Sequence, residues 1–255
     1  IINESDLSTN ELKEVVSRTL HGIEIEPHLA RLSKALLRDA IYMHSGVEAC
    51  DLEPVIICGN TLSRDEPEHL YDAIIGNPPY GRIYRPSKTK RARFPNASGE
   101  GYANLYALFI EQSLRWVRPG GLIGLIVPTS FIGGPYYQTL RRYILETAEV
   151  LQIDQIQMRS DVFIDVKHDI CVFVIRRKKL CGQDSTQRSM PTSALVRSDG
   201  SVEDLGTIDI PGEPSGRVWA LPVLGSRASL FSGGLWTLET YGYHIRTGSF
   251  VWNRE

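Results

Sequence analysis

The sequence lacks any apolar run close to the roughly 20 residues that a membrane-spanning helix needs. Residues 1–6 also lack the basic and then apolar order of a signal peptide. These two absences argue against a membrane or secreted protein, so we expect a cytoplasmic one. At 255 residues, the chain is long enough for one large domain, or for one domain and part of a second.

Recognisable metal-ligand patterns are also missing. The four cysteines, Cys50, Cys58, Cys171 and Cys181, have no C-x-x-C spacing. Because Cys58 and Cys171 lie in strand-like apolar runs, we expect buried, reduced thiols rather than disulfides or a zinc site. The six histidines are scattered, with no H-x-x-x-H or H-E-x-x-H arrangement. No metal site is predicted.

Short apolar segments alternate with helix-like segments along the chain. We expect strands at 22–26, 54–58, 71–76, 122–128, 150–156 and 169–175, and helices at about 10–20, 27–45, 103–117 and 135–147. This alternation predicts an α/β doubly wound, mostly parallel sheet that binds ligands at the carboxyl ends of its strands. Periodic apolar stretches become rare after residue 176. We therefore predict a main domain at 1–179, followed at 180–255 by a linker and the start of a smaller domain.

The tetrapeptide Asn77-Pro78-Pro79-Tyr80 directly follows the expected strand 71–76. Two prolines fix φ and donate no hydrogen bond, so the carbonyls of Asn77 and Pro78 are held stiffly as acceptors, beside the Asn77 amide oxygen. Such acceptors can hold an exocyclic NH2 group with its lone pair aimed at an electrophile. Tyr80 offers a face on which a flipped base can stack. The pattern favours methyl transfer to a planar nitrogen over an ordinary turn.

A basic stretch comes next. The net charge of −2 hides an asymmetry, because residues 1–72 hold 14 acids and 6 bases and residues 73–255 hold 16 acids and 22 bases. Six cations fall between residues 82 and 93 without one acid: Arg82, Arg85, Lys88, Lys90, Arg91 and Arg93. We interpret this stretch as a mobile loop that follows nucleic-acid phosphates. A merely solvated charge run is the alternative, but the position next to Tyr80 favours nucleic acid.

Together these features resemble the adenine-N6 DNA methyltransferases of restriction-modification systems, particularly the group in which target recognition follows the catalytic region. Beyond the tetrapeptide, the residues that carry the resemblance are Gly22-Ile23-Glu24-Ile25-Glu26-Pro27, the run from Asn104 to Gly121, Val127-Pro128 and Asp161-Val162-Phe163. The resemblance implies the S-adenosylmethionine-dependent methyltransferase fold, S-adenosylmethionine as methyl donor and double-stranded DNA as partner. It also implies that residues 1–179 form the catalytic domain and that 180–255 begin the target recognition domain.

The same resemblance implies roles for individual residues. Glu24 matches the acid that holds the cofactor ribose, although an acid before a helix also fits the helix dipole. Asn60 stands where the family usually has an Asp that holds the cofactor adenine, and it is equally well explained as a left-handed turn residue after Gly59. Phe163 matches the aromatic that packs on the flipped adenine opposite Tyr80, or else is a core residue. Asn77 and the Pro78 carbonyl then hold N6, which attacks while neutral, so that no strong base is needed.

One departure from the family concerns its glycine-rich cofactor loop, of the form Asp-Pro-x-Cys-Gly-x-Gly, which is expected upstream of the helix at 10–20. The chain begins there with Ile1, and neither Gly120-Gly121 nor Gly133-Gly134 has the pattern. We therefore expect a fragment, incomplete at both ends, that binds the cofactor weakly or not at all.

Two alternatives stay open. The same tetrapeptide serves enzymes that methylate RNA bases or protein glutamines, against which stand the basic stretch and the region after residue 180. The second alternative is a nucleic-acid-binding remnant without catalysis.

Overall fold

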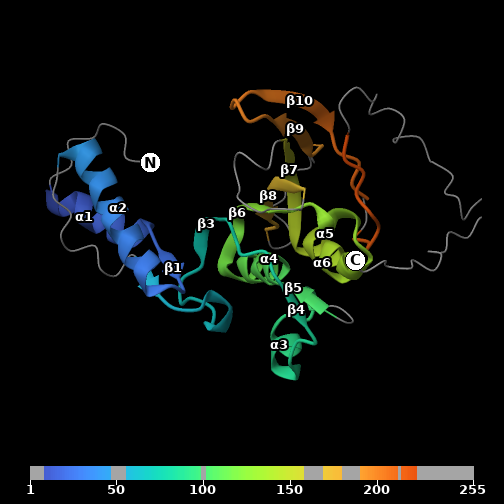
Figure 1. The fold of residues 1–255 in the computed structure, drawn as a ribbon, viewed down its shortest axis with the longest axis horizontal. Helices are drawn as coiled ribbons and strands as arrows, with labels where there is room; N and C mark the ends of the chain where they lie inside the picture. The colour runs from blue at the N-terminus through green and yellow to red at the C-terminus, as the bar shows by residue number, and fades with distance from the viewer. Residues whose placement is uncertain are drawn as a thin grey trace, which may run out of the picture. The chain divides into compact units, whose positions relative to one another are not determined.

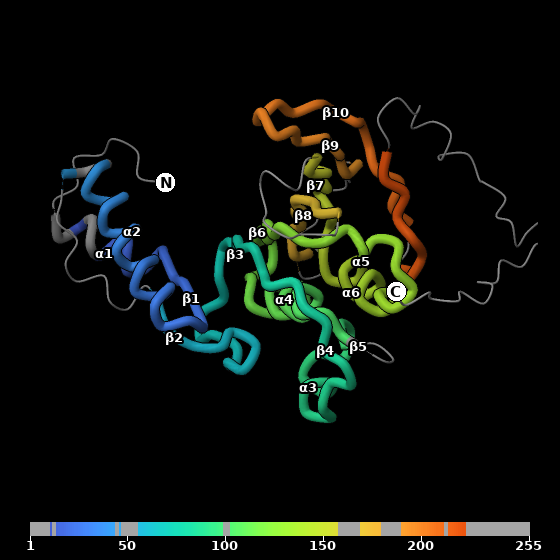
Figure 2. Tube along the Cα trace, in the orientation of Figure 1, coloured from blue at the N-terminus to red at the C-terminus, as the bar shows by residue number. Residues whose placement is uncertain are grey.

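A computed structural model of the chain describes residues 9–46, 56–98, 102–157, 169–179, 190–211 and 214–222 (Figures 1 and 2). The chain divides into two units, Ile1–Glu66 and Pro67–Glu255. Within the described ranges, no helix combines the length and the apolar character needed to cross a membrane.

The first unit contains a short parallel strand pair with helices. Its elements are α1 (Thr9–Thr19), β1 (Gly22–Glu24), α2 (Pro27–Ser45), β2 (Ile56–Cys58) and the 3-10 helix η2 (Thr61–Ser63). Pro27 opens α2, where a missing N–H costs nothing, and Gly46 ends it at a φ of 69°. Strands β1 and β2 pair in parallel, with Glu24 opposite Cys58. The order predicted for this part of the chain is confirmed, with β1 shorter than the expected strand at 22–26.

The second unit is built on a six-stranded sheet. Its strands are β3 (Tyr71–Gly76), β6 (Val117–Pro128), β7 (Ala148–Ile156), β8 (Ile170–Arg177), β9 (Thr192–Val196) and β10 (Val202–Thr207). The spatial order is β10-β9-β7-β8-β6-β3, which Figure 2 traces. Pairs β3–β6 and β7–β9 are parallel, and β8 is antiparallel to both β6 and β7. Strands β3, β6, β7 and β9 therefore run in one direction, as the predicted α/β class requires.

Four helical segments accompany this sheet: α4 (Leu105–Trp116), α5 (Ser130–Gly133), η3 (Pro135–Tyr137) and α6 (Gln138–Thr147). Helix α4 is buried along most of its length, with Tyr106 and Leu108 fully enclosed. An aromatic cluster forms the centre of the core, where Phe131 packs on Phe173 at 4.8 Å and edge-on against Trp219 at 5.8 Å between ring centroids. Burial of such rings is a main source of stability in a domain of this size.

The described residues beyond position 180, 190–211 and 214–222, continue this structure. Strand β9 pairs with β7, where Asp154 accepts the Ala194 N–H at 2.9 Å and the Ser193 hydroxyl donates to the Ile153 carbonyl at 2.7 Å. Trp219 is 2% exposed. The first described residues after the predicted boundary thus belong to the sheet and core of the second unit. Where a separate C-terminal domain begins stays a prediction.

A buried arginine holds residues 214–222 against α5 and α6. The Arg141 guanidinium is 1% exposed and donates only to backbone carbonyls. Its acceptors are Phe131 at 2.7 Å, Gly134 at 2.8 Å, Gly216 at 2.7 Å and Arg217 at 2.9 Å. One side chain therefore joins two segments about 75 residues apart in sequence.

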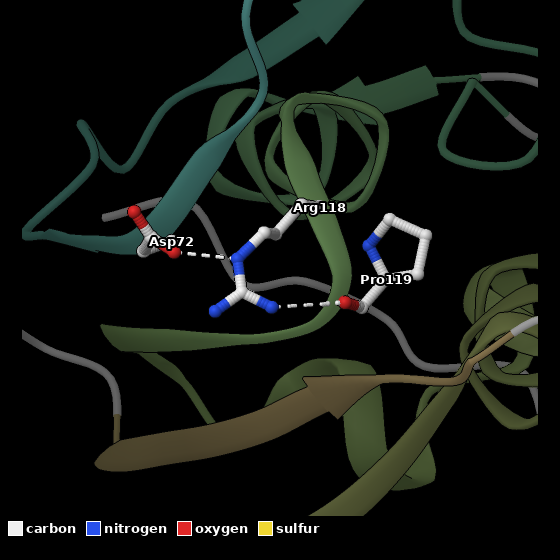
Figure 3. Close-up of polar contacts among 3 residues, drawn as sticks. All are labelled: Asp72, Arg118 and Pro119. Atoms are coloured by element: carbon white, nitrogen blue, oxygen red, sulfur yellow. Dashed lines mark hydrogen bonds and ion pairs between the residues drawn. The ribbon is translucent and has the colours of Figure 1, made fainter. Parts of the chain in front are cut away.

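The two parallel strands nearest the candidate site are also joined at their amino ends. Arg118, at the start of β6, donates from Nε to Asp72 on β3 and from Nη1 to the Pro119 carbonyl at 3.2 Å (Figure 3). Both charged side chains are at least half exposed, so the pair adds little stability. Gly121 lies beside it, and a Cβ there would come within 2.7 Å of the Asp72 carbonyl oxygen. Glycine thus permits the close approach of β6 to β3.

The expectation for the cysteines is confirmed in part. Cys171 is fully buried and reduced, and its thiol donates to the Val127 carbonyl at 3.5 Å. For Cys58 the expectation of burial is wrong, because this side chain at the end of β2 is exposed. Cys50 and Cys181 lie outside the described residues.

Candidate active site

The tetrapeptide Asn77-Pro78-Pro79-Tyr80 lies immediately after the carboxyl end of β3. Pro78 is buried, Asn77 is exposed and Tyr80 is half-buried. Carboxyl ends of β3, β6, β7 and β9 share one edge of the sheet, since these strands run in the same direction. The polar end of Asn77 therefore meets solvent at the edge where α/β folds bind ligands.

The Tyr80 hydroxyl is held by two acceptors. It lies 2.9 Å from Asn77 Oδ1 and 3.0 Å from the Ile126 carbonyl oxygen of β6. Burial is the main cause that raises the pKa of Tyr80 to about 12, with a smaller contribution from Cys171. The phenol consequently stays protonated at neutral pH and keeps its hydrogen to donate. This contact links the motif to the neighbouring strand and fixes the amide of Asn77.

Five of the six cations after the motif lie on folded elements rather than on the mobile loop that the sequence suggested, and Arg85 lies between these elements. Arg82 lies on β4 (Arg82–Tyr84), which pairs with β5 (Tyr102–Asn104), and four cations lie on α3 (Lys88–Arg93). The Ser87 hydroxyl caps α3 by accepting the Lys90 N–H at 3.2 Å. The expectation of a loop is wrong because capping and tertiary contacts order a segment whose own apolar content is low. Arg85, Lys88 and Arg91 are exposed.

Both ends of this basic segment meet beside Tyr80. Gly81 donates its N–H to Asn104 Oδ1 at 3.3 Å, and its carbonyl accepts the Leu105 N–H at 2.8 Å. Asn104 precedes the first residue of α4. Sequence reasoning did not assign a role to Asn104 or to the Ile126 carbonyl. The helix was expected over 103–117, which placed Asn104 inside it, whereas α4 begins at Leu105.

Sequence reasoning also assigned no role to Glu111, although the sequence contains a signal for a buried, hydrogen-bonded acid at this position. It is a single acid in α4, where its neighbours at helical spacing, Ala107, Leu108 and Leu114, are apolar and buried. An acid on such a face is costly unless hydrogen-bonded. The structure shows it 2% exposed and bonded to Asn96 and Ala97.

Glu24 and Asn60 lie together in the first unit. Glu24 ends β1 and Asn60 follows β2 by two residues, and the Gly59 N–H donates to the Glu24 carbonyl at 2.9 Å. One Glu24 carboxylate oxygen accepts the Glu26 N–H at 2.9 Å. Asn60 Oδ1 accepts the Leu62 N–H at 3.0 Å and so caps η2. The left-handed turn considered for Asn60 is wrong, because its φ is −90°.

Two further expectations from the sequence stay predictions. Phe163 lies outside the described residues, so its stacking role stays a prediction; Gln157 and Asp169, described on either side, lie at the carboxyl edge of the sheet. Across the described ranges, no group of three or more His, Cys, Asp or Glu side chains has a metal-binding arrangement. The expectation of no metal stays a prediction.

Comparison with known proteins connects this geometry to a family. The model of the Eco57I restriction-modification methylase family matches residues 20–163. Among similar proteins, type II methyltransferase M.BsuBI of Bacillus subtilis is 28% identical over 154 residues, covering 57% of this chain and 30% of that protein. Type II methyltransferase M.TthHB8I of Thermus thermophilus is 33% identical over 88 residues, covering 31% of this chain and 21% of that protein. The chain thus spans less than a third of these relatives.

Solved structures support the same fold. The M protein of the type I restriction enzyme EcoKI has a TM-score of 0.53 and 17% identity, over 76% of this chain and 38% of that one. The DrdV–DNA complex has a TM-score of 0.53 and 14% identity, over 78% of this chain and 23% of that one. Since the family model covers more than half of the sequence, the chain belongs to the Eco57I restriction-modification methylase family.

Proposed function

We propose that the protein transfers a methyl group from S-adenosylmethionine to the N6 amino group of an adenine flipped out of double-stranded DNA. It does so in the cytoplasm, as the modification activity of a restriction-modification system. The observation that carries the proposal is the placement of Asn77-Pro78-Pro79-Tyr80 at the carboxyl end of β3, with the Asn77 amide oriented by Tyr80. Membership of the methylase family supports the reaction class.

S-adenosylmethionine is implied by the fold and the family, and the residues present in the first unit fit its adenosine part. Glu24 uses one carboxylate oxygen for the Glu26 N–H, which leaves its other oxygen to accept from ribose hydroxyls. Asn60, at the end of the adjacent parallel strand, offers an amide for the adenine ring. When bound, the cofactor supplies an electrophilic methyl group on a sulfonium.

Asn77, Pro78 and Tyr80 bind and orient the base in this proposal. Asn77 Oδ1 and the Pro78 carbonyl oxygen accept the two N6 hydrogens, which turns the nitrogen lone pair out of conjugation with the ring. Tyr80 supplies a stacking face, and Phe163 is the proposed opposite face. Because Asn77 Oδ1 already accepts from the Tyr80 hydroxyl, an incoming amine competes for this oxygen, while the phenol retains the Ile126 carbonyl as acceptor.

The six cations that follow the motif are the proposed contacts to the DNA backbone. Arg82, Arg85, Lys88, Lys90, Arg91 and Arg93 lie on or beside β4 and α3, and the segment that bears them begins and ends next to Tyr80. A flipped base remains attached to its own phosphates, so cations near the base pocket are suitably located to hold them.

Two substitutions at Tyr80 distinguish the contribution of its ring from that of its hydroxyl. Tyr80→Phe keeps the ring and loses the hydroxyl contacts to Asn77 and to the Ile126 carbonyl. Because a single hydroxyl hydrogen serves both acceptors, we expect methyl transfer to fall by tenfold or less, roughly the worth of one hydrogen bond. Tyr80→Ala also loses base stacking, worth about 1–3 kcal/mol per base, and should weaken DNA binding as well. Steady-state kcat and KM for DNA distinguish the two variants. Equal defects in both would show that the hydroxyl, rather than the ring, carries the role.

The proposed function is tested by transfer of labelled methyl from S-adenosylmethionine, using protein expressed from its complete gene. Unmethylated duplex DNA, the same DNA made of N6-methyladenine, and a matched RNA serve as substrates. Label in unmethylated DNA, recovered as N6-methyladenine after nucleoside digestion, is the expected result. Label in RNA or in protein alone would contradict DNA as the substrate, and label on cytosine would contradict adenine.

A further inference from the structure

The segment from residue 82 to residue 98, here called the basic arm, is anchored to α4 through one buried carboxylate. Glu111 accepts the Ala97 N–H at 2.7 Å and the Asn96 N–H at 3.2 Å on Oε2, and the Asn96 side-chain amide at 3.0 Å on Oε1. Both oxygens are therefore occupied by the arm. Burial raises the pKa of Glu111, and the donors from Ala97 and Asn96 oppose this shift.

A second contact fixes the same end of the arm. Phe94 is fully buried, and the guanidinium of Arg115 lies 5.0 Å from the centre of its ring. Arg115 also donates to the Arg93 carbonyl at 3.0 Å and to Gln112 Oε1 at 2.8 Å. The end of α3 and the residues that follow it are thus held on α4 by Glu111 and Arg115, which lie one helical turn apart.

All charged side chains of the basic arm are positive. It contains six cations and no acid. Glu111 uses its oxygens on neutral N–H groups rather than on these cations. Within the described ranges, the ion pairs of the structure leave Lys88, Lys90 and Arg91 without a carboxylate partner. A carboxylate that anchors the arm without neutralising it leaves the positive charge available to a polyanion.

We propose that Glu111 is a positioning residue for DNA binding, whose carboxylate ties residues 96 and 97 to α4 and thereby holds the cations of α3 in place for the phosphates of duplex DNA. This inference rests on the proposed function for its partner. It adds a residue that touches neither DNA nor cofactor and acts through the arm. A fixed arm does not lose conformational freedom on binding, which favours affinity.

Glu111→Gln tests the inference because the change in DNA affinity that we predict for it is opposite to the change that charge alone predicts. The substitution removes a negative charge, and charge alone predicts equal or tighter DNA binding. We instead expect about tenfold weaker binding of a non-specific duplex, because one of the two carboxylate oxygens that hold the arm is replaced by an NH2 group and the other loses its charge. The slope of log Kd against log salt should also fall by about one or more, as phosphate contacts are lost.

Glu149→Gln is the matched control. It makes the same change of charge on β7, where Glu149 pairs with Arg176 at 3.4 Å, away from the arm. We expect its DNA affinity and salt slope to equal those of the unsubstituted protein. Asn96→Ala gives a second test with the carboxylate intact, since it removes one donor to Glu111, and it should weaken binding in the same direction by a smaller factor.

Trypsin cleavage without DNA separates the two proposals. Glu111→Gln should speed cleavage after Lys88, Lys90 and Arg91, whereas Glu149→Gln should not. Failure of the unsubstituted protein to bind duplex DNA would overturn the proposed partner and the role of Glu111 in binding it. Unchanged cleavage and unchanged affinity in Glu111→Gln and Asn96→Ala would overturn the positioning role alone, with the proposed function left standing.

Discussion

Asn77→Ala should lower the rate of methyl transfer by about 10²–10³-fold, the usual cost of removing one preorganised hydrogen-bond partner of the reacting group. The amide oxygen is the acceptor that orients N6, and alanine provides none. The fold should not suffer, because Asn77 is exposed and the Tyr80 hydroxyl keeps the Ile126 carbonyl as acceptor. DNA affinity should therefore remain near its original value.

Single-turnover methylation and equilibrium DNA binding measure the two properties separately. Asp72→Ala, at the other end of β3, is the matched control: its carboxylate forms only an exposed ion pair with Arg118 (Figure 3), so its activity should be nearly unchanged. Retention of full turnover in Asn77→Ala would refute the assignment of Asn77 as the residue that orients the amine.

Arg141→Met should reduce the free energy of unfolding by about 3 kcal/mol or more, since hydrogen bonds from a charged donor are worth about 1.5–3 kcal/mol each and buried acceptors left unpaired are costly. Methionine has a similar length but no donor, so carbonyls of Phe131, Gly134, Gly216 and Arg217 lose their shared partner. Residues 214–222 should then separate from α5 and α6, and Trp219 should become exposed.

Denaturant unfolding measures the loss of stability. Because the chain has four tryptophans, the fluorescence change that Trp219→Phe abolishes is the one that reports the environment of Trp219. Arg142→Met is the control on the same helix, because the Arg142 side chain is exposed and should be replaceable within about 0.5 kcal/mol. A loss of stability no greater than that of Arg142→Met would mean that Arg141 does not anchor the C-terminal segment.

The sequence was most informative where local pattern and chemistry coincide. Strand β3 and the tetrapeptide after it were predicted from an apolar run followed by two prolines, and both ends of α2 follow from Pro27 and Gly46. The parallel arrangement followed from the alternation of elements. These features depend on residues close together in the chain, which is why a single sequence is sufficient to predict them.

The features that were not predicted depend mostly on partners that are distant in the sequence. Helix α3 has almost no apolar face, and its order comes from Phe94 and Glu111, the latter on another helix. Strand β9 is short and joins the sheet through Asp154 and Ser193, whose contacts span 40 residues. Likewise, the cap that Asn60 forms on η2 could not be told from a left-handed turn, because asparagine suits both.

The two ends of the basic arm lie next to each other, which affects how the segment tolerates insertions. Gly81 bonds to Asn104 and Leu105, so the residues between them leave and re-enter the domain at one point. An insertion with adjacent ends can change in length at small entropic cost and without shifting the flanking strand or helix. A replacement segment would need a buried aromatic anchor at the position of Phe94, N–H donors for Glu111, and cations placed to reach the DNA phosphates.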